Sequence, residues 1–553
     1  MKKRTLRNIK SNLIACWALF LILLPMSADA QVHRIGIRFV NDAAEFYDCE
    51  SDSKFIPRGN NYIRLAKQKR PDGGELYYHS TFNVGLYDTV RTAQALKKMK
   101  HYGYNVVRVF LNHFCDGGIG DKNSHLSHIY MNNVVDFLRR AKANSIYVMF
   151  TIDWLPIQSR VSAVENFWCP DFQCTNAQIL TSEGLQSNQL FFMRFIKELI
   201  VRNAPIDIIF AYELRNELTF EPHLPPLSLS SGTITTANGK TYNLAKPSEK
   251  KKMLEEGLIY WIDQVRAKIR EVDPSALVTV GLIPPQNTDV ISTDLRKLSI
   301  TTPVIWNSSA DFVDLHVYPI ADGTTIQEFV DRFGIAGVKN KPVVMGEFGT
   351  IKHYYLSIDA AVRDLQQWQA ASCAYGFTGW ILWSWDLDIQ SDTYNALDGN
   401  ESVNRVLAPV YRPDPCATAS LDLQHPNIAL DKPVKASRFT KNNKASHAVD
   451  GTSLPWVAGD NAPQWIEIDL QKPEPINKIR LMVAQTPAGE TIHQIWVRES
   501  NKDYRMFKEI RGRTTDSQVL EFPTSGLTNI RFIKVVTVKS PSWVGWKEIE
   551  IIK

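Results

Sequence analysis

The chain has 553 residues, of which 44% are hydrophobic and 22% are charged. This composition is typical of soluble globular proteins and excludes a disordered chain, a fibrous repeat and a protein with many membrane spans. At roughly 100–200 residues per domain, the length predicts two to four domains. The formal net charge is +5, but residues 1–30 hold five basic side chains and one acidic one. The nearly neutral remainder lacks the concentrated basic face that nucleic acid binding requires, so no nucleic acid partner is expected.

Residues 1–30 have the pattern of an export signal. A basic stretch at residues 2–10 precedes an apolar run at residues 13–26, and Ala28 and Ala30 form a small-residue cleavage pattern. The apolar run is short for a transmembrane helix. We therefore expect a cleaved signal peptide, no stable membrane span after cleavage, and a secreted, periplasmic or cell-surface protein. An uncleaved anchor is the alternative.

Six cysteines follow this signal, and export permits disulfide bonds. Cys169 and Cys174 are five residues apart in a loop that contains proline, which makes a local bridge plausible. Buried thiols are the interpretation for the others, which are Cys49, Cys115, Cys373 and Cys416. No spacing of His and Cys resembles a zinc site.

Between residues 54 and 385, short apolar segments alternate with amphipathic helical ones. The expected strands cover residues 55–62, 106–110, 146–153, 206–213, 277–282, 312–316, 343–346 and 380–383. The expected helices include residues 90–100, 132–142, 189–201, 249–271 and 358–374. This alternation predicts parallel strands joined by right-handed crossovers, and eight units fit an α/β fold of the (β/α)8 TIM-barrel type. A doubly wound open sheet is the alternative, although no glycine-rich phosphate loop follows the first strand.

Residues 221–246 interrupt the alternation with a segment rich in Pro, Ser, Thr and Gly. Because strand-to-helix loops lie on the active-site face of a barrel, this segment either shapes a substrate cleft or forms a solvated hairpin.

The pattern changes after residue 385. Residues 395–410 can complete the last barrel helix, and the proline-containing segment 411–415 indicates a linker. Alternating runs then appear at residues 465–470, 479–483, 495–497 and 532–536, which predicts an all-β jelly-roll sandwich. We therefore expect a signal peptide over 1–30, a barrel over 31–413, a linker over 414–425 and a sandwich over 426–553.

Two glutamates stand where barrel strands are expected to end. Glu217 follows the fourth expected strand and Glu347 follows the seventh. In a barrel, these strand ends project side chains into one shared mouth. Paired carboxylates suit glycosidic cleavage, because one protonates the leaving oxygen while the other attacks the sugar or activates water. A surface or salt-bridged role is the ordinary alternative for any single glutamate.

Five motifs in this order resemble glycoside hydrolase family 5, a family of retaining barrel glycosidases. They are Gly103-Tyr104-Asn105-Val106-Val107-Arg108-Val109, Leu214-Arg215-Asn216-Glu217, Asp314-Leu315-His316-Val317-Tyr318, Pro342-Val343-Val344-Met345-Gly346-Glu347-Phe348-Gly349 and Gly379-Trp380-Ile381-Leu382-Trp383-Ser384-Trp385. The resemblance covers residues 54 to about 413. It implies hydrolysis of a polysaccharide or oligosaccharide, with no cofactor for catalysis.

The resemblance also implies a role for each motif residue. Glu217 would be the general acid/base and Glu347 the nucleophile, with their carboxyl groups roughly 5–5.5 Å apart for retention. Five further residues would bind the substrate or support the two glutamates. Arg108 would keep Glu347 ionised, and Tyr318 would donate a hydrogen bond to Glu347. Asn216 would bond the sugar 2-hydroxyl, His316 would position the acid or the sugar, and Trp383 would stack on the sugar. A surface ion pair is the alternative for Arg108, a core histidine for His316 and a core tryptophan for Trp383. Trp380 and Trp385 suit core packing better.

One position departs from the family pattern. The family often has a histidine at the end of the third strand, whereas this chain has Asp153 and Trp154 there. Contacts to the substrate are therefore expected to differ, while the carboxylate pair is unaffected.

Residues 426–553 resemble a coagulation-factor type-C, or discoidin-like, module of the carbohydrate-binding kind. The matching stretches include Ala448-Val449-Asp450-Gly451 and Gln464-Trp465-Ile466-Glu467-Ile468-Asp469-Leu470. Such modules often hold a structural calcium, for which Asp450 and Glu548 are the candidate ligands because calcium prefers hard oxygen donors. Ordinary turn and strand acids are the alternative. Trp456, His493 and Trp543 either reach a sugar from the loops or pack in the core.

These observations favour an exported retaining β-glycoside hydrolase that cuts within a β-linked polysaccharide, with the sandwich as a glycan tether. An exo-acting or transglycosylating enzyme and a non-catalytic glycan-binding protein are the alternatives, because fold alone does not decide function. The sequence does not specify the polysaccharide, the linkage or the oligomeric state.

Overall fold

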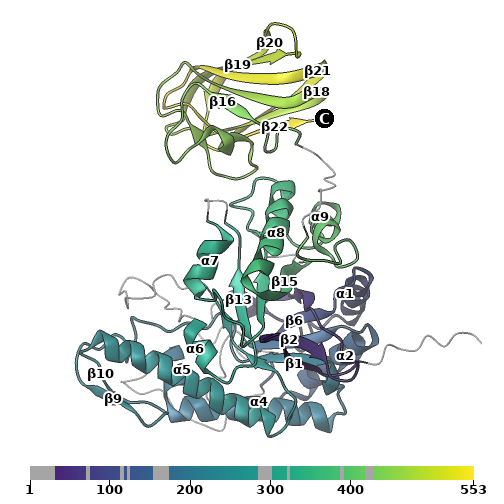
Figure 1. The fold of residues 1–553 in the computed structure, drawn as a ribbon, viewed down its shortest axis with the longest axis vertical. Helices are drawn as coiled ribbons and strands as arrows, with labels where there is room; N and C mark the ends of the chain where they lie inside the picture. The colour runs from purple at the N-terminus through teal and green to yellow at the C-terminus, as the bar shows by residue number, and fades with distance from the viewer. Residues whose placement is uncertain are drawn as a thin grey trace, which may run out of the picture.

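The computed structural model describes residues 32–69, 75–112, 117–120, 125–152, 174–283, 302–320, 324–386, 392–417 and 427–553. They form a barrel with surrounding helices and a separate all-β unit at the C-terminal end of the chain (Figure 1). The expected signal peptide, Cys115, Cys169 and the pair Asp153–Trp154 lie outside the described residues. No helix in the described part of the chain has the length and hydropathy to cross a bilayer.

The barrel is built from parallel strands in the expected order. They are β3 (Arg58–Tyr62), β6 (Val106–Leu111), β7 (Tyr147–Ile152), β8 (Ile209–Glu213), β11 (Val278–Thr279), β12 (Gly281–Leu282), β13 (Val313–Val317), β14 (Val343–Phe348) and β15 (Phe377–Trp385). β11 pairs with β8 and β12 pairs with β13. Only Val280 separates β11 from β12, so the two halves of this fifth strand close the ring, which confirms the TIM-barrel expectation and excludes the open sheet.

The barrel helices are α1 (Thr89–His101), α2 (His128–Ala143), α3 (Cys174–Leu180), α4 (Ser182–Val201), α5 (Pro247–Arg270), α6 (Thr302–Asn307), α7 (Ile326–Phe333), α8 (Ile358–Ser372) and α9 (Asp398–Leu407). Side chains at the N-termini of several of these helices accept backbone N–H bonds, as Asp88 does for α1 and Thr325 does for α7. Their apolar faces and the fully buried strands form one continuous core. The expected strand at 206–213 begins three residues late, because Ile206–Ile208 form a 3₁₀ turn, η1.

A hairpin that the sequence pattern did not predict covers one end of the barrel. β1 (Ile35–Val40) and β2 (Ala43–Asp48) pair antiparallel. Phe46 of β2 is fully buried against Phe210, near the start of β8, and Phe312, which precedes β13. The hairpin therefore plugs the end of the barrel where the strands begin, opposite the catalytic end. A second hairpin, β4 (Leu65–Lys69) and β5 (Glu75–His79), follows the first barrel strand.

The segment 221–246 contains a third hairpin, β9 (Thr233–Thr235) and β10 (Thr241–Asn243). Tyr242 is buried, and its hydroxyl donates to Glu256 of α5. The backbone N–H of Ala237 donates to Leu180 at the end of α3. The hairpin is thus anchored to the outer helices, and Figure 1 shows it beside α5.

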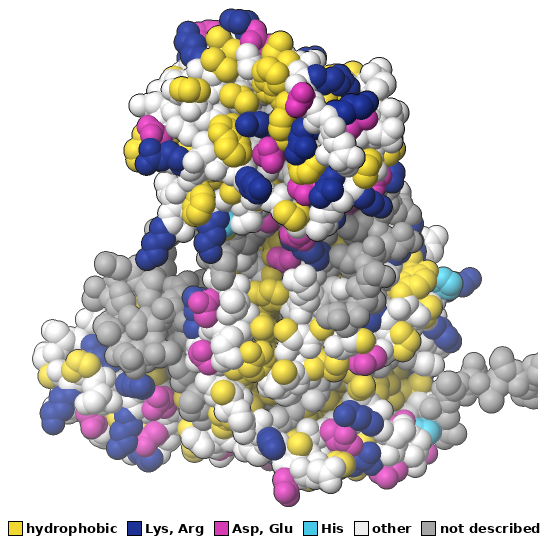
Figure 2. Space-filling view, turned by 45° about the horizontal axis from the view of Figure 1, so that its top comes forward, with side chains coloured by type: hydrophobic (Ala, Val, Ile, Leu, Met, Phe, Trp, Pro, Cys, Tyr) yellow, Lys and Arg dark blue, Asp and Glu magenta, His cyan; other side chains and the backbone are white. Residues whose placement is uncertain are grey.

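The C-terminal unit is an antiparallel β-sandwich. Its elements are β16 (Val434–Ala436), η3 (Ala445–Val449), β17 (Trp456–Val457), β18 (Gln464–Val483), β19 (Gly489–Arg498), β20 (Arg505–Thr514), β21 (Val519–Lys539) and β22 (Gly545–Ile552). The long strands β18 and β21 pair along most of their length, β19 pairs with the C-terminal half of β21, and β22 pairs with the C-terminal half of β18. Alternating buried residues from both halves form a separate core. Basic, acidic and apolar side chains intermix on the face shown in Figure 2.

Several polar contacts join the sandwich to the barrel. Arg363 of α8 forms an ion pair with Asp431 and donates to the backbone carbonyl of Asp450. The backbone N–H of Leu356 donates to the carbonyl of Gly451. A Cβ on Gly451 would lie 2.4 Å from Cβ of Ala360, so a side chain at this position would separate the two surfaces.

The cysteine interpretation needs two corrections. Cys373, at the end of α8, and Cys416 form a disulfide, so they are not thiols. Cys49 is an exposed thiol because it stands in the turn after β2 instead of in the core. The bond between Cys373 and Cys416 fastens the chain that leaves the barrel to its last long helix.

Candidate active site

The motif residues converge at the end of the barrel where the strands finish. Glu217 lies four residues after β8, and Glu347 lies within β14, one residue before its end. Glu217 has a positive φ of 43°, which is rare for a residue with a side chain and costs of order 1–3 kcal/mol. The chain thus turns sharply at the residue that the sequence singles out, as strained backbone often does at functional sites.

Arg108 is the hub of the site. It lies in the middle of β6 and is completely buried, so the alternative of a surface ion pair is wrong. Its five N–H groups meet five acceptors: two oxygens of Glu213 at 2.6 and 2.8 Å, Oδ1 of Asn61 at 2.8 Å, Oε1 of Glu347 at 2.8 Å and Oδ1 of Asn216 at 2.7 Å. A planar guanidinium is the side chain that can satisfy such a fan of acceptors.

Glu347 is held at both oxygens. Oε1 accepts from Arg108, and Oε2 accepts from the Tyr318 hydroxyl at 2.6 Å. Burial raises the pKa of Glu347, while the positive charges of His316 and Arg108 act against this rise. Burial, together with the charge of Glu347, raises the pKa of Tyr318 well above its usual range, so this phenol stays a donor.

His316 connects the two glutamates. Its Nδ1 lies 3.2 Å from Oε1 of Glu217 and 3.5 Å from Oε2 of Glu347. Burial lowers the pKa of His316, but the charge of Glu347 and the bond to Glu217 outweigh burial and raise it to about 9. The ring is therefore an imidazolium at neutral pH. One carboxylate oxygen of Glu217, one of Glu347 and a nitrogen of His316 all lie within 4.8 Å of one another.

The three tryptophans of β15 are all buried, Trp383 least so at 8% exposed, so they do not divide into core and exposed rings. Trp380 and Trp385 are buried, and the indole N–H of Trp380 donates to Ser372. Trp383 packs beside Tyr318 and meets Phe110 edge to face. Its contact with Tyr318 places the indole next to the residue that bonds Glu347.

Two acidic residues that the sequence reasoning missed lie beneath the pair. Glu213, the last residue of β8, and Asp314 of β13 are both fully buried. Burial and the charge of Glu213 raise the pKa of Asp314 to about 8. The available signal was an acidic residue inside an otherwise apolar strand, as in Ile-Phe-Ala-Tyr-Glu and Val-Asp-Leu-His-Val.

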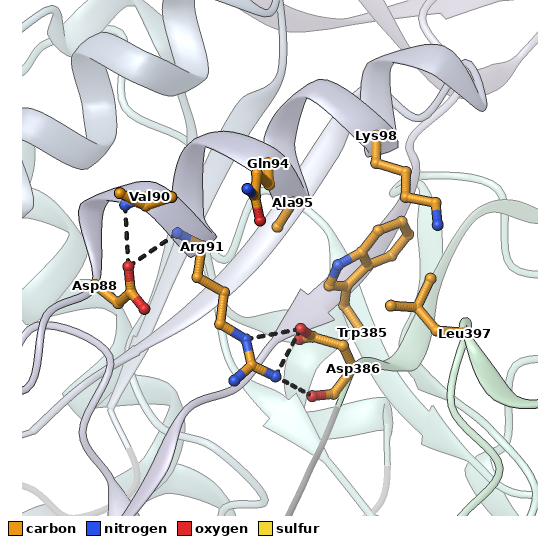
Figure 3. Close-up of a pocket in the computed structure, with 9 residues that line it drawn as sticks. All are labelled: Asp88, Val90, Arg91, Gln94, Ala95, Lys98, Trp385, Asp386 and Leu397. Atoms are coloured by element: carbon orange, nitrogen blue, oxygen red, sulfur yellow. Dashed lines mark hydrogen bonds and ion pairs between the residues drawn. The ribbon is translucent and has the colours of Figure 1, made fainter.

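A cavity of about 460 Å³ lies between α1 and the end of β15, lined by Arg91, Trp385, Asp386 and their neighbours (Figure 3). Asp386 forms ion pairs with Arg91 and Arg64. None of the motif glutamates lines this cavity. Its charged groups instead tie the end of β15 to α1.

The sandwich candidates separate into buried and exposed residues. Trp456 is buried and donates to the carbonyl of Arg438, while His493 is buried against Trp546. These two are core residues, whereas Trp543 is 57% exposed. Asp450 and Glu548 are neighbours: the backbone N–H of Gly451 donates to Glu548, and the charge of Asp450 helps burial to raise the pKa of Glu548 well above its usual range.

Comparisons with known proteins found two family models and several solved structures that match parts of this chain. Residues 433–551 match the F5/8 type C domain model. An endo-1,4-beta-mannanase from Rhizomucor miehei superposes with a TM-score of 0.47 at 17% identity, covering 68% of this chain and 100% of that one. The exo-beta-1,4-mannosidase Op5Man5 from Opitutaceae bacterium strain TAV5 gives 0.41 at 16% identity, covering 67% and 59%. The family 32 carbohydrate-binding module of C. perfringens NanJ, in complex with galactose, gives 0.21 at 16% identity, covering 22% and 94%. No curated protein matches this chain.

The cellulase model matches residues 71–388, more than half of the chain, and this range includes every barrel motif discussed above. The chain therefore belongs to the cellulase family, glycosyl hydrolase family 5, and is a glycoside hydrolase.

Proposed function

We propose that this protein is an exported, retaining β-glycoside hydrolase that cuts within a β-linked polysaccharide, with its sandwich domain holding the enzyme on glycan. The observation that carries the mechanism is the proximity of the two carboxylates, which have oxygens within 4.8 Å of each other. Retaining enzymes place these groups about 5–5.5 Å apart, whereas inverting enzymes leave about 6.5–9.5 Å for a water molecule.

In the first step, Glu347 attacks the anomeric carbon while Glu217 gives its proton to the leaving oxygen, which yields a glycosyl ester and a free alcohol. In the second step, Glu217 takes a proton from water, and the resulting hydroxide displaces Glu347. Glu347 is buried and held by Arg108 and Tyr318, which suits a fixed nucleophile. The Glu217 side chain is 36% exposed, which suits an acid that meets leaving groups and water.

The remaining motif residues would act on the substrate or on this pair. Arg108 fixes Oδ1 of Asn216, which turns the amide nitrogen away from the guanidinium and towards a substrate hydroxyl. His316, as an imidazolium, donates to Glu217. Trp383 supplies a flat apolar face for a pyranose ring.

The first experiment follows the anomer formed from a β-linked oligosaccharide by proton NMR, because retention gives the β-anomer first. Glu347→Ala should abolish hydrolysis, and Glu217→Ala should harm polysaccharide hydrolysis more than hydrolysis of an aryl glycoside with an acidic leaving group. Glu256→Ala, on α5, is the matched control and should be active. An α-anomer as first product, or an active Glu347→Ala variant, would refute the mechanism.

The second experiment tests endo action on a panel of β-linked glucans, mannans and xyloglucans. Endo cleavage produces a range of oligosaccharides early in the reaction. Single sugars from the outset would instead favour the exo-acting alternative.

The glycan tether rests on two exposed aromatic side chains in neighbouring loops. Phe439 is 60% exposed and Trp543 is 57% exposed. Their loops flank β17, because Thr440 bonds to the carbonyl of Val457 while Ala458 bonds to the carbonyl of Val544. Exposed rings of this kind can stack on sugars. Trp543→Ala should weaken binding of the protein to the polysaccharide that it hydrolyses. Met506→Ala, which replaces an exposed apolar residue on β20, should not weaken this binding. Equal binding by the two variants would refute the tether.

A structural calcium ion is proposed near Asp450 and Glu548. Both residues offer hard carboxylate oxygens, and two adjacent acids create a need for positive charge that a divalent cation would meet. Calcium would raise the unfolding temperature of the sandwich without being required for hydrolysis. Titration calorimetry with calcium tests this assignment on the chelator-treated protein and on the Glu548→Gln variant. The assignment is refuted if the two proteins give the same heat of calcium binding.

A further inference from the structure

The barrel interior contains a second layer of ionisable groups directly below the catalytic pair. It consists of Glu213 from β8 and Asp314 from β13, and Arg108, His316 and Glu347 face it from the neighbouring strands. One oxygen of Glu213, one of Asp314 and a nitrogen of His316 lie within 4.8 Å of one another. Neither acid touches solvent.

The two acids have opposite surroundings. Glu213 is gripped by Arg108 through two parallel bonds of 2.6 and 2.8 Å, the geometry of a strong guanidinium–carboxylate pair. Asp314 has no hydrogen-bond partner at either oxygen among the described residues. An ionised carboxylate without a donor is very costly in a buried site, whereas a neutral acid is much less so.

Glycines on two strands make room for this layer. A Cβ on Gly346 would lie 1.9 Å from Oδ1 of Asp314, and a Cβ on Gly281 would lie 2.3 Å from Oε1 of Glu213. Gly346 directly precedes the nucleophile Glu347 in β14. The space for the two acids is therefore built into the strands that carry the site.

The charges of the cluster balance under one assignment. Arg108 and His316 are positive, and Glu213 and Glu347 are negative. A charge on Asp314 would leave the buried group with a net negative charge and no donor to stabilise it. The charge count and the missing donors lead to the same protonation state.

We propose that Glu213 is an ionised positioning residue that turns Arg108 so that its remaining N–H groups reach Glu347 and Asn216, while Asp314 is a neutral carboxylic acid that fills the space between Glu213 and His316. Glu213 and Asp314 are chemically similar side chains with two different roles. Glu213 acts on the reaction through the orientation of Arg108, and Asp314 contributes shape without charge. The kinetic consequence rests on the proposed function of Glu347.

The kinetic test compares two nearly isosteric exchanges. Glu213→Gln should lower kcat at least tenfold with KM changed less than threefold, because the misaligned Arg108 no longer holds Glu347 and Asn216. Asp314→Asn should keep kcat within threefold at pH 6–7, because an amide replaces a neutral acid. Asp273→Asn is the control: both oxygens of Asp273 accept from one guanidinium nitrogen of Arg34 at the opposite end of the barrel, so the loss of this buried ion pair should lower stability without changing kcat.

An infrared titration tests the protonation states without substrate, so its outcome is independent of the proposed function. The wild-type protein should show the carbonyl stretch of a buried protonated carboxyl that disappears with a midpoint near pH 8. Asp314→Asn should lack this band. Glu213→Gln should keep the band but lower its midpoint, because the neighbouring negative charge is gone.

Several results would overturn the proposal. Wild-type kcat in Glu213→Gln would remove its positioning role, and a tenfold loss in Asp314→Asn would show that the charge of Asp314 is needed. An Asp314→Asn spectrum that retains the band would place the proton elsewhere. If Glu213→Gln does not fold, Glu213→Asp, which withdraws the carboxylate by one methylene, should show the same loss of kcat; normal kcat there would also overturn the assignment.

Discussion

Replacement of Arg108 by lysine tests whether the shape of the guanidinium or its charge organises this active site. Arg108→Lys keeps one positive charge but offers three N–H groups from a single atom, whereas five acceptors surround the native side chain. At least two acceptors therefore lose their donor. At about 1.5–3 kcal/mol for each bond to a charged group, the loss is about 3–6 kcal/mol.

The loss should appear in both stability and rate. If about 3 kcal/mol of it falls on the alignment of Glu347 in the transition state, kcat/KM drops about 10²-fold, since about 1.4 kcal/mol corresponds to a factor of ten. The assays are hydrolysis of an aryl β-glycoside and scanning calorimetry. Expected results are a lower unfolding temperature for the barrel and a kcat/KM reduced by two orders of magnitude.

The control is Arg34→Lys, at the end of the barrel covered by the β1–β2 hairpin, where one nitrogen of Arg34 bonds both oxygens of Asp273 and another bonds the carbonyl of Ile209. This control should lose stability and keep activity. If Arg108→Lys retains kcat/KM within threefold and the same unfolding temperature, charge alone suffices, and the reasoning from donor geometry is refuted.

Three further predictions concern regions away from the active site. Cys373→Ser should lower the unfolding free energy by roughly 4 kcal/mol, because the disulfide closes a loop with a sequence separation of 43 residues; unchanged calorimetry would contradict the loop-entropy argument. Burial lowers the pKa of His493 to about 4, so the unfolded chain binds a proton at this histidine before the folded chain does as the pH falls. The resulting contribution to the free energy of unfolding, about 3 kcal/mol, is present above pH 6.5 and is lost as the pH falls towards 4. Urea unfolding at pH 7 and pH 5 should show this loss in the wild type and not in His493→Gln. Arg363→Ala should broaden the distribution of interdomain distances in small-angle scattering without changing hydrolysis of a small aryl glycoside, and an unchanged scattering curve would mean that its bond to Asp431 does not hold the junction.

The sequence was sufficient for the barrel because its strands are buried on both faces and appear as continuous apolar runs. Errors arose where a run changed character within itself. Ile206-Asp207-Ile208 form a 3₁₀ turn ahead of the strand, and the run 277–282 is interrupted at Val280 so that it can pair with both neighbours. Pairing partners decide such details, and a single segment does not record them.

The β1–β2 hairpin was missed although its turn has a recognisable signal. Asn41 and Asp42 both have positive φ, which is the backbone of the tight turn that joins two antiparallel strands. Ile35 and Phe46 of these strands both belong to the barrel core. The hairpin precedes residue 54, where the alternation of apolar and helical segments begins, so the pattern that predicts the barrel does not include it.

The proximity of Glu217 and Glu347 was predictable because their motifs follow recognisable strands, whereas the acidic layer below them was not predicted. Glu213 and Asp314 stand in otherwise apolar strand segments, but only the closed barrel shows that the two acids lie together. The same limit applied in the sandwich, where Trp456 and His493 are core residues and Trp543 is exposed. Aromatic content predicts that rings line surfaces or cores, but strand phase and pairing decide which ring does which.

The buried cluster also explains why the fold and the site depend on each other. Burying Arg108 alone, or either of its glutamates alone, would cost several kcal/mol, and only the assembled set satisfies every N–H of the guanidinium. The members come from β6, β8, β13 and β14, so the charges are balanced only when these strands are in register. Correct closure of the barrel and the orientation of Glu347 therefore depend on the same contacts, and a variant that removes a donor or an acceptor of Arg108 is expected to lower stability and activity together.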